Sequence, residues 1–331
     1  MHARALISGI TGQDGSYLSN TLLKRGYSVI GTSTRDTPSA ETPQKGLHIV
    51  RGNIADESFV DQIVKEHKPD EIYNLASIST VAEPWDNSAT IARVTGLAPL
   101  YFLNAIRKFA PATRFFQASS AEMYGNPSVS PQDELTPFSP QNPYGAAKLF
   151  AHTMIEMYRK KLGIFAVSGI LFNHESPRRP LGFVTRKITH TLAVIAKGSS
   201  EVLELGNLSA ECDWSFAGDI AEGMRLSLQH DVADTYVFAS GHVHTVREFV
   251  EESARLLGMG LSWKGSGAHE IGVDGKGRTI VRVNPSFMRP QSVHPRCGNI
   301  TKARKMLGWE PRVSFSELVA MMVRSEQKKG T

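Results

Sequence analysis

The first half of the chain alternates short apolar runs with stretches whose hydrophobic residues recur at helical spacing. Alternation of this kind predicts an α/β fold, a doubly wound parallel sheet with helices on both faces. Ligands in such folds bind beyond the carboxyl ends of the strands. The expected strands are 3–8, 27–31, 47–50, 71–76, 113–118 and 164–171, and the expected helices are 14–25, 56–67, 90–108 and 144–162.

The pattern changes after about residue 172. A polar loop, 173–180, is followed by shorter and more mixed elements, and no linker separates the two parts. We therefore expect a dinucleotide-binding domain over 1–172 that also carries the catalytic residues. A smaller mixed α/β substrate-binding cap over 173–331 would have segments interleaved with the first domain. Its expected helices are 183–197, 217–230, 245–257, 301–308 and 314–327.

A glycine-rich turn joins the first expected strand to the first expected helix. Gly9, Gly12 and Gly15 are spaced G-x-x-G-x-x-G. The first glycine allows a tight turn, the second lets a pyrophosphate approach the helix N-terminus, and the third lets helix and strand pack closely. The strand before this turn and the helix after it favour a Rossmann-type dinucleotide site over a merely flexible loop.

The residues after the second expected strand bear on the choice of dinucleotide. An acidic residue there would select NAD, whereas Arg35 can pair with a 2′-phosphate. Asp36 follows directly and weakens this preference. We expect NADP, with NAD as the alternative, and a comparison of the two dissociation constants decides between them.

Two short segments in the middle of the chain carry candidate chemistry. Tyr144 and Lys148 are four positions apart, so both lie on one face of a helix. We expect the ammonium to lower the phenol pKa, which would make Tyr144 a usable base. The Ser120 hydroxyl could hold a substrate alcohol against it. Glu122 would lie on the same face of an extended strand end and supply a second base, which indicates elimination as well as oxidation.

Composition fits an ordinary enzyme. The 331 residues are 41% hydrophobic, and we expect no membrane span. The net charge of +5 is too mild and scattered for nucleic acid but suits an anionic small substrate. The two cysteines, Cys212 and Cys297, and the start of the chain favour a reduced, cytoplasmic location. His242, His244 and His294 do not form a full ligand set with Cys297, so no metal is expected.

These motifs resemble those of the extended short-chain dehydrogenase/reductases, and in particular the GDP-mannose 4,6-dehydratases. The resemblance rests on the glycine turn, on the Ser-x-Glu and Tyr-x-x-x-Lys set, and above all on the segment NHESPRRPLGFVTRK over 173–187. It extends to 289–290 and to the LGWEP at 307–311. It implies oxidation at sugar C4, loss of water across C5 and C6, and return of the hydride to C6.

The family's functional residues carry over position by position. The resemblance implies that Ser120, Glu122, Tyr144 and Lys148 are catalytic, with Ser120 where the family usually has Thr. Substrate contacts would come from Ser79, Ser120, Glu122, Asn173, Lys187 and Arg289. Cofactor contacts would come from Gly9, Thr11, Gly12, Gln13, Asp14, Gly15, Arg35, Asn53, Ile54, Leu75, Ala76, Ser77, Ser79, Tyr144, Lys148, His174 and Arg179. Asn53 stands where the family usually has Asp.

Two departures from the family pattern concern the substrate pocket. The family has Arg-Asp-Trp where this chain has Cys212-Asp213-Trp214, and a Glu where it has Ser292. A cation and a carboxylate are thus both missing, which looks like a compensated change. The loop after Arg35 also lacks the family's tetramer-building pattern, so we expect a homodimer through helices near 90–108 and 144–162, with a homotetramer as the alternative.

Four interpretations of function follow. The first is a GDP-sugar 4,6-dehydratase acting on a GDP-mannose-type substrate. The second is the same reaction on GDP-manno-heptose. The third is an NADPH-dependent 4-keto sugar-nucleotide reductase or an epimerase of the same fold, against which Glu122 argues. The fourth, a non-catalytic sugar-nucleotide binder, is disfavoured by the complete set of catalytic residue types.

Overall fold

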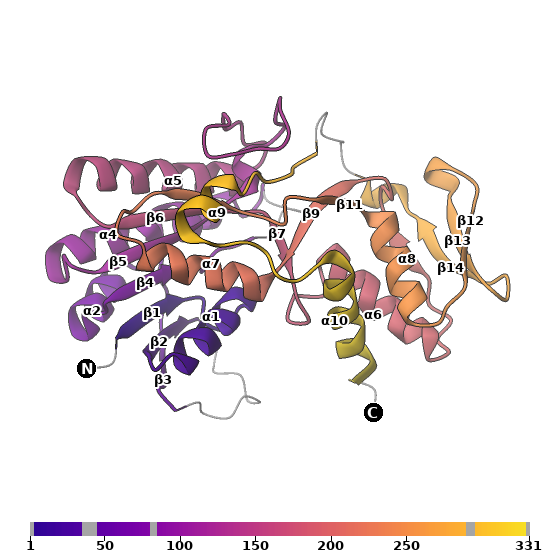
Figure 1. Cartoon of the computed structure of the whole chain (residues 1–331), viewed down its shortest axis with the longest axis horizontal. Coiled ribbons are helices and arrows are strands. Elements are labelled where there is room, and N and C mark those ends of the chain that lie inside the picture. Colours follow the sequence, from indigo (N-terminus) through magenta and orange to yellow (C-terminus); the bar gives the residue numbers. More distant parts are fainter. Residues whose placement is uncertain (1–2, 35–44, 80–84, 289–294, 329–331) are drawn as a thin grey trace.

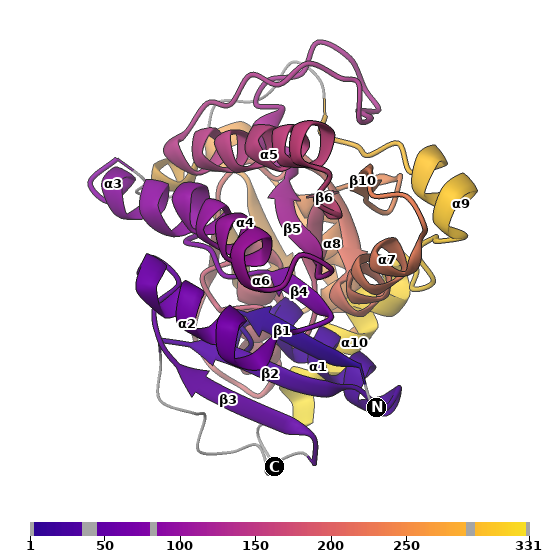
Figure 2. The same cartoon turned by 90° about the vertical axis from the view of Figure 1, so that its left-hand side faces the viewer.

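The computed structural model describes residues 3–34, 45–79, 85–288 and 295–328. Arg35 and Arg289 lie outside the described residues. Six strands from the first half and one from beyond residue 172 form a seven-stranded sheet in which every strand pair is parallel (Figures 1 and 2). In spatial order its strands are β10 (Thr235–Phe238), β6 (Ala166–Leu171), β5 (Arg114–Ser120), β4 (Glu71–Asn74), β1 (Arg4–Ser8), β2 (Ser28–Ser33) and β3 (Leu47–Arg51).

Helices cover both faces of this sheet, which confirms the predicted doubly wound fold (Figure 2). On one face Val60, Phe102 and Ile155 join a buried cluster, and on the other Leu18 and Ile220 join another. The first face carries α2 (Glu57–His67), α4 (Ala98–Phe109) and α5 (Pro143–Leu162), and the second carries α1 (Gln13–Lys24), α7 (Ala217–Gln229) and α9 (Thr301–Leu307).

The expected helix over 90–108 contains an irregular turn. It consists of α3 (Ser88–Ile91), the π-helical turn η1 (Ala92–Leu97) and α4. Pro99 lies in the first turn of α4 and has no amide hydrogen for the carbonyl four residues earlier, which favours such a widened turn. By length and composition alone Ser88–Phe109 could cross a membrane, but half of its most apolar window is buried in the protein. It is a core helix that packs against α2 and α5.

The second half lies beside the sheet (Figure 1). Ile188, Phe249 and Leu318 centre its own buried core. Its helices are α6 (Val184–Ala196), α8 (Val246–Leu256) and α10 (Phe315–Lys328). They pack with a four-stranded sheet, which consists of β12 (Leu261–Lys264), β13 (Ile271–Asp274), β14 (Thr279–Val283) and β8 (Leu203–Leu205). A three-stranded sheet runs between the halves and consists of β11 (Val243–Thr245), β9 (Glu211–Phe216) and β7 (Asn173–Glu175).

The sequence pattern did not predict strand β10. Its four residues follow α7 and pair in parallel with β6, so a segment from beyond residue 172 completes the first sheet. The helices α7 and α9 also pack on that sheet (Figure 1). A four-residue strand between helices carries too little periodicity to be distinguished from a turn, and only its pairing with β6 identifies it.

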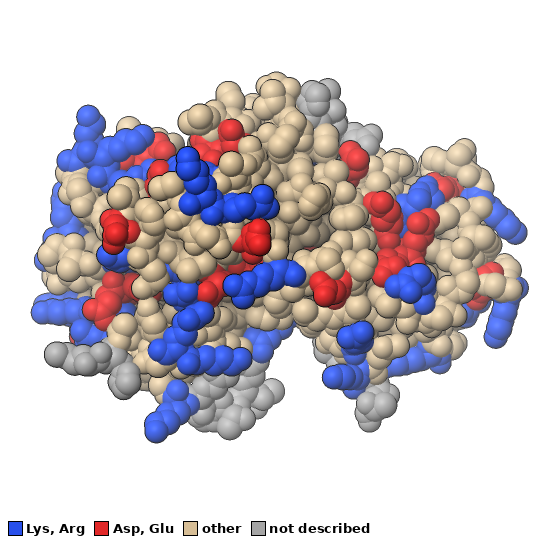
Figure 3. Space-filling view, viewed as in Figure 1, with Lys and Arg blue, Asp and Glu red and all other residues tan. Residues whose placement is uncertain are grey.

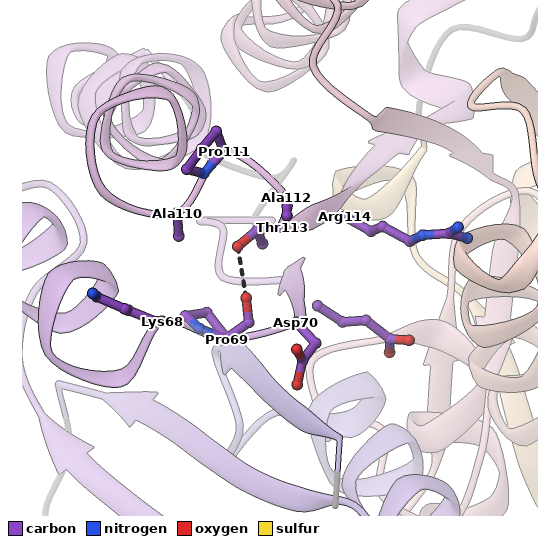
Figure 4. Close-up of a pocket in the computed structure, with 9 residues that line it drawn as sticks. Lys68, Pro69, Asp70, Ala110, Pro111, Ala112, Thr113 and Arg114 are labelled. Carbon is purple, nitrogen blue, oxygen red and sulfur yellow. Dashed lines mark hydrogen bonds between the residues drawn. The ribbon is translucent and has the colours of Figure 1, made fainter. Parts of the chain in front are cut away.

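Strand order positions the site. Chain order reverses between β1 and β4, the neighbouring strands whose carboxyl ends lead into the glycine turn and into Leu75. This switch point is where doubly wound sheets bind ligands. The pocket in Figure 4 lies at the opposite edge, where β4 and β5 begin, and is lined by residues 68–71 and 110–114. It holds none of the predicted site residues.

Candidate active site

The glycine turn forms a tight link between β1 and α1. Gly9 has φ +73°, in the left-handed region that glycine tolerates. A Cβ on Gly15 would lie 2.5 Å from the Gly9 carbonyl oxygen, so this position has to remain glycine for helix and strand to pack. Gly12, the N-cap of α1, provides no side-chain acceptor for the amides of the first turn. These amides and the positive end of the helix dipole fit a pyrophosphate.

Hydroxyl groups border this turn at the end of β2. Thr11 Oγ1 lies 3.3 Å from Ser33 Oγ, and Thr32 accepts hydrogen bonds from the Gly9 and Ile10 amides through its carbonyl oxygen. The described residues at the end of β2, Thr32 to Thr34, include no carboxylate. This stretch is where a carboxylate would bind the ribose of NAD.

A buried polar network ties together the ends of three strands. Ser8 Oγ donates to Asn74 Oδ1 at 2.6 Å and accepts from the amides of Leu75 and Ala76 at 3.0 and 3.1 Å. Asn74 donates in turn to Gln117 on β5 at 2.8 Å. Burial makes unpaired polar groups costly, so this network fixes the strand ends against each other. Leu75 and Ala76 were predicted as cofactor contacts, whereas Ser8, Asn74 and Gln117 were not predicted as site residues.

Asn53 and Ser79, two predicted contacts, are exposed in the segments that follow β3 and β4, whereas Ile54 is buried. Asn53 Oδ1 accepts from the Ala55 amide at 3.0 Å, so the side chain also shapes its own turn. Ser77 is closer to the candidate chemistry, because its hydroxyl hydrogen-bonds with Tyr144.

The 173–179 segment packs directly onto the glycine turn. His174 Nε2 lies 3.0 Å from both carboxylate oxygens of Asp14, and its Nδ1 lies 2.7 Å from the Phe172 carbonyl oxygen. Gln13 donates to the His174 carbonyl oxygen at 3.0 Å and accepts from Ser176 at 2.8 Å. Residues about 160 positions apart thus build one wall of the site. His174, a predicted cofactor contact, directs both ring nitrogens to protein groups.

The Asp14–His174 contact changes both pKa values. Burial acts to raise the pKa of Asp14, but the charge and hydrogen bond of His174 outweigh it and lower the pKa to about 2. Burial acts to lower the pKa of His174, and the Asp14 carboxylate reverses this and raises it. An ion pair therefore joins the two halves of the site.

Tyr144 and Lys148 lie together on the first turns of α5, as predicted. The N-cap Asn142 accepts from the Gly145 amide at 2.8 Å, and Pro143 starts the helix. The Lys148 ammonium donates to the Ala118 carbonyl oxygen at 2.6 Å and lies 5.6 Å from the centre of the Tyr144 ring. Both side chains are buried.

We expected the Lys148 ammonium to lower the pKa of the Tyr144 phenol, and this expectation was wrong. Burial raises the pKa of Tyr144 to about 12, against the hydrogen bonds from Ser120 and Ser77 that act to lower it. Burial also lowers the pKa of Lys148 to about 8. Desolvation outweighs the helical proximity on which the expectation rested.

Glu122 does not continue the extended strand, contrary to expectation. β5 ends at Ser120, and Glu122 lies in the short 3₁₀ turn η2 (Ala121–Met123), where its amide donates to Ser120 Oγ at 3.2 Å. The two side chains nevertheless converge on Tyr144, because the hydrogen bond of Ser120 and the charge of Glu122 both act on its pKa.

Two residues that the sequence analysis did not single out hold the Glu122 carboxylate. Asn142 Nδ2 donates to Oε2 at 3.0 Å, and Arg296 Nη1 donates to Oε1 at 2.5 Å. The Asn-Pro pair before a helix was a signal for Asn142 as a cap. Nothing local in the sequence links Arg296 to a residue 174 positions earlier.

The remaining predicted residues spread from the catalytic group into the second half. Arg179 pairs with Glu175 at 3.2 Å, and its charge acts on both Asp14 and Tyr144. Asn173 is exposed on β7. Lys187 on α6 holds its ammonium 4.1 Å from the Phe287 ring centre.

The fold and this site define a Rossmann-type protein of the short-chain dehydrogenase/reductase class. A UDP-glucose 4-epimerase from Thermotoga maritima superimposes with a TM-score of 0.84 at 21% identity over 99% of this chain and 100% of its own. A dTDP-glucose 4,6-dehydratase from Bacillus anthracis, in complex with NAD, gives 0.82 at 19% identity over 98% and 97%. A protein named RMD from Pseudomonas aeruginosa, complexed with NADPH, gives 0.78 at 19% identity over 99% of both chains.

Sequence comparison gives the family itself. The model of the GDP-mannose 4,6 dehydratase family matches residues 6–322. The human GDP-mannose 4,6 dehydratase is 43% identical over 97% of this chain and 91% of its own length. That of Vibrio cholerae is 39% identical over 99% and 95%. The chain belongs to the GDP-mannose 4,6-dehydratase family, as the motifs indicated.

Proposed function

We propose that the protein dehydrates GDP-mannose to its 4-keto-6-deoxy form with a recycled NADP. The observation that carries this proposal is the convergence of Ser120, Glu122, Tyr144 and Lys148 at the carboxyl end of β5, next to the strand β4 that borders the switch point. A plain alcohol dehydrogenase needs Ser, Tyr and Lys, whereas a carboxylate at the same phenol adds a base for a carbon-bound proton.

Each side chain has a defined task. Tyr144 takes the proton of the sugar 4-hydroxyl as a phenolate, a form that the hydrogen bonds of Ser120 and Ser77 favour against the burial that raises its pKa. Ser120 holds the sugar hydroxyl, and the 4-ketone that forms acidifies the proton on C5. Glu122 takes the C5 proton as the C6 hydroxyl leaves as water. A dinucleotide held at the glycine turn would supply the oxidised ring that takes up the C4 hydride and returns it at C6. The proton that leaves with the hydroxyl and the one returned to C5 balance the two removed.

The residues fit a dinucleotide at the glycine turn. The uncapped first turn of α1 and the closely packed glycines suit the pyrophosphate. The end of β2 offers hydroxyls in place of the carboxylate that selects NAD, which supports NADP together with the sequence position of Arg35. A ratio of NAD to NADP dissociation constants below one would contradict the NADP assignment.

GDP-manno-heptose is the second candidate substrate. Cys212 stands where the family has a cationic Arg, so the substrate pocket differs there from the family pattern. Burial raises the pKa of the Cys212 thiol to about 11, which keeps it uncharged near neutral pH. Incubation with each GDP-sugar, followed by the alkali-induced absorbance of a 4-keto sugar, tests both candidates. Product from GDP-mannose at the higher kcat/KM supports the proposal, and product from GDP-manno-heptose alone overturns the choice of sugar. Net consumption of NADPH would indicate a reductase.

We also propose a homodimer through α5 and the helix before it. Ala146, Phe150, Thr153 and Met157 form an exposed stripe along α5, in which Phe150 is 43% and Met157 53% exposed. Exposed large apolar side chains at helical spacing are typical of an interface.

We propose a cytoplasmic location. Both cysteines are free thiols, which suits a reducing compartment. Charges of both signs are interspersed on the face shown in Figure 3.

A further inference from the structure

Arg296 occupies a place in the site that its position in the sequence does not suggest. It lies in the irregular segment before α9, and its guanidinium reaches the Glu122 carboxylate. Its side chain is about one-third exposed, against about one-fifth for Glu122. The contact lies at the carboxyl end of β5, on the side of the sheet edge where Tyr144 is held.

Buried groups hold the backbone on both sides of Arg296. The Gln132 side chain donates to the Pro295 carbonyl oxygen at 3.2 Å and accepts from the Cys297 amide at 3.0 Å. The Gly298 amide donates to Asp213 at 3.1 Å. Gln132 and Asp213 are almost completely buried. The segment is therefore anchored, and the guanidinium is aimed at Glu122 by the fold.

The opposite side of Glu122 is equally constrained. Asn142 donates to the second carboxylate oxygen and also caps α5, the helix that carries Tyr144 two residues later. Gly145 packs against the Glu122 backbone, where a Cβ would lie 2.7 Å from the carbonyl oxygen. One donor on each oxygen fixes the plane of the carboxylate relative to the phenol. Lone pairs remain available on both oxygens, so the group can still accept a proton.

We propose that Arg296 is a positioning residue for Glu122, which it holds as an oriented carboxylate for the removal of the C5 proton. The inference rests on the proposed dehydration and adds a residue to it. Arg296, from the 295–299 segment, brings a positive charge to the Glu122 carboxylate. The nearby Cys212, which stands where the family has Arg, is a neutral thiol whose pKa burial raises. Charge-assisted hydrogen bonds of this kind are short and directional, which suits a positioning role.

The rates of C4 oxidation and of elimination, measured separately, distinguish a positioning role of Arg296 from a merely structural one. We expect Arg296→Leu to slow elimination about tenfold to a hundredfold, the usual cost of a misplaced catalytic group. Oxidation at C4 should keep its rate, so reduced dinucleotide accumulates at 340 nm in a stopped-flow mixture with GDP-mannose. The KM should stay unchanged while kcat falls, and Arg296→Lys should restore part of kcat.

Arg304→Leu is the matched control, because Arg304 on α9 makes an exposed ion pair with Glu310 at 3.3 Å. It should leave kcat, KM and the 340 nm trace as in the wild type. Equal slowing of oxidation and elimination by Arg296→Leu, no change in either, or a raised KM with normal kcat each overturns the inference. Wild-type protein that forms no 4-keto product would instead overturn the proposed function itself.

Discussion

The Asp14–His174 ion pair predicts a pH-dependent contribution to stability. A pKa difference of one corresponds to about 1.4 kcal/mol. Because the pKa of Asp14 falls from 3.8 to about 2 on folding, the ionised side chain contributes about 2 kcal/mol near pH 6. This contribution is present above pH 3.8 and is lost as pH falls toward 2. His174 has a raised pKa, so its contribution is present below pH 6.5 and is lost as pH rises through the folded value.

The variant Asp14→Asn tests this reasoning. We expect its free energy of unfolding, from urea titrations, to lie about 2 kcal/mol below the wild type near pH 5.5. This difference in the free energy of unfolding should fall to about 1 kcal/mol by pH 3, and it should also fall in alkaline solution. Asp231→Asn, at an exposed carboxylate after α7, should stay within about 0.5 kcal/mol of the wild type throughout. A gap for Asp14→Asn that stays constant from pH 3 to pH 9 would refute the argument.

Three further predictions concern catalysis, the cofactor and assembly. Glu122→Gln should abolish 4-keto product while NADP binding, measured by calorimetry, stays as in the wild type; full turnover would contradict the role of Glu122. Gly15→Ala places a Cβ 2.5 Å from the Gly9 carbonyl oxygen and should weaken NADP binding at least tenfold, whereas Gly182→Ala, with open space around it, should not. Phe150→Glu should convert the dimer to monomer in sedimentation, and an unchanged mass would exclude the α5 interface.

Local patterns predicted helix α5 and the glycine turn well, because each is encoded in a few adjacent residues. The expected helix 144–162 is α5, which begins at Pro143, and the expected strand 3–8 is β1 over Arg4–Ser8. Glu122 was identified by residue type, but its backbone was not, since a 3₁₀ turn after a strand has no periodicity to recognise. The pKa of Tyr144 was also mispredicted, because burial is a property of the fold.

The sequence by itself determined the fold class, the glycine turn and the residue types at the candidate active site. These depend on hydrophobic periodicity, on glycine and on short spacings, which act over a few residues. Only the tertiary structure decided that β10 completes the first sheet, that His174 pairs with Asp14, and that Arg296 reaches Glu122. Those contacts join residues 67 to 174 positions apart. No local preference specifies them, because they form only when strand order and packing bring distant segments together.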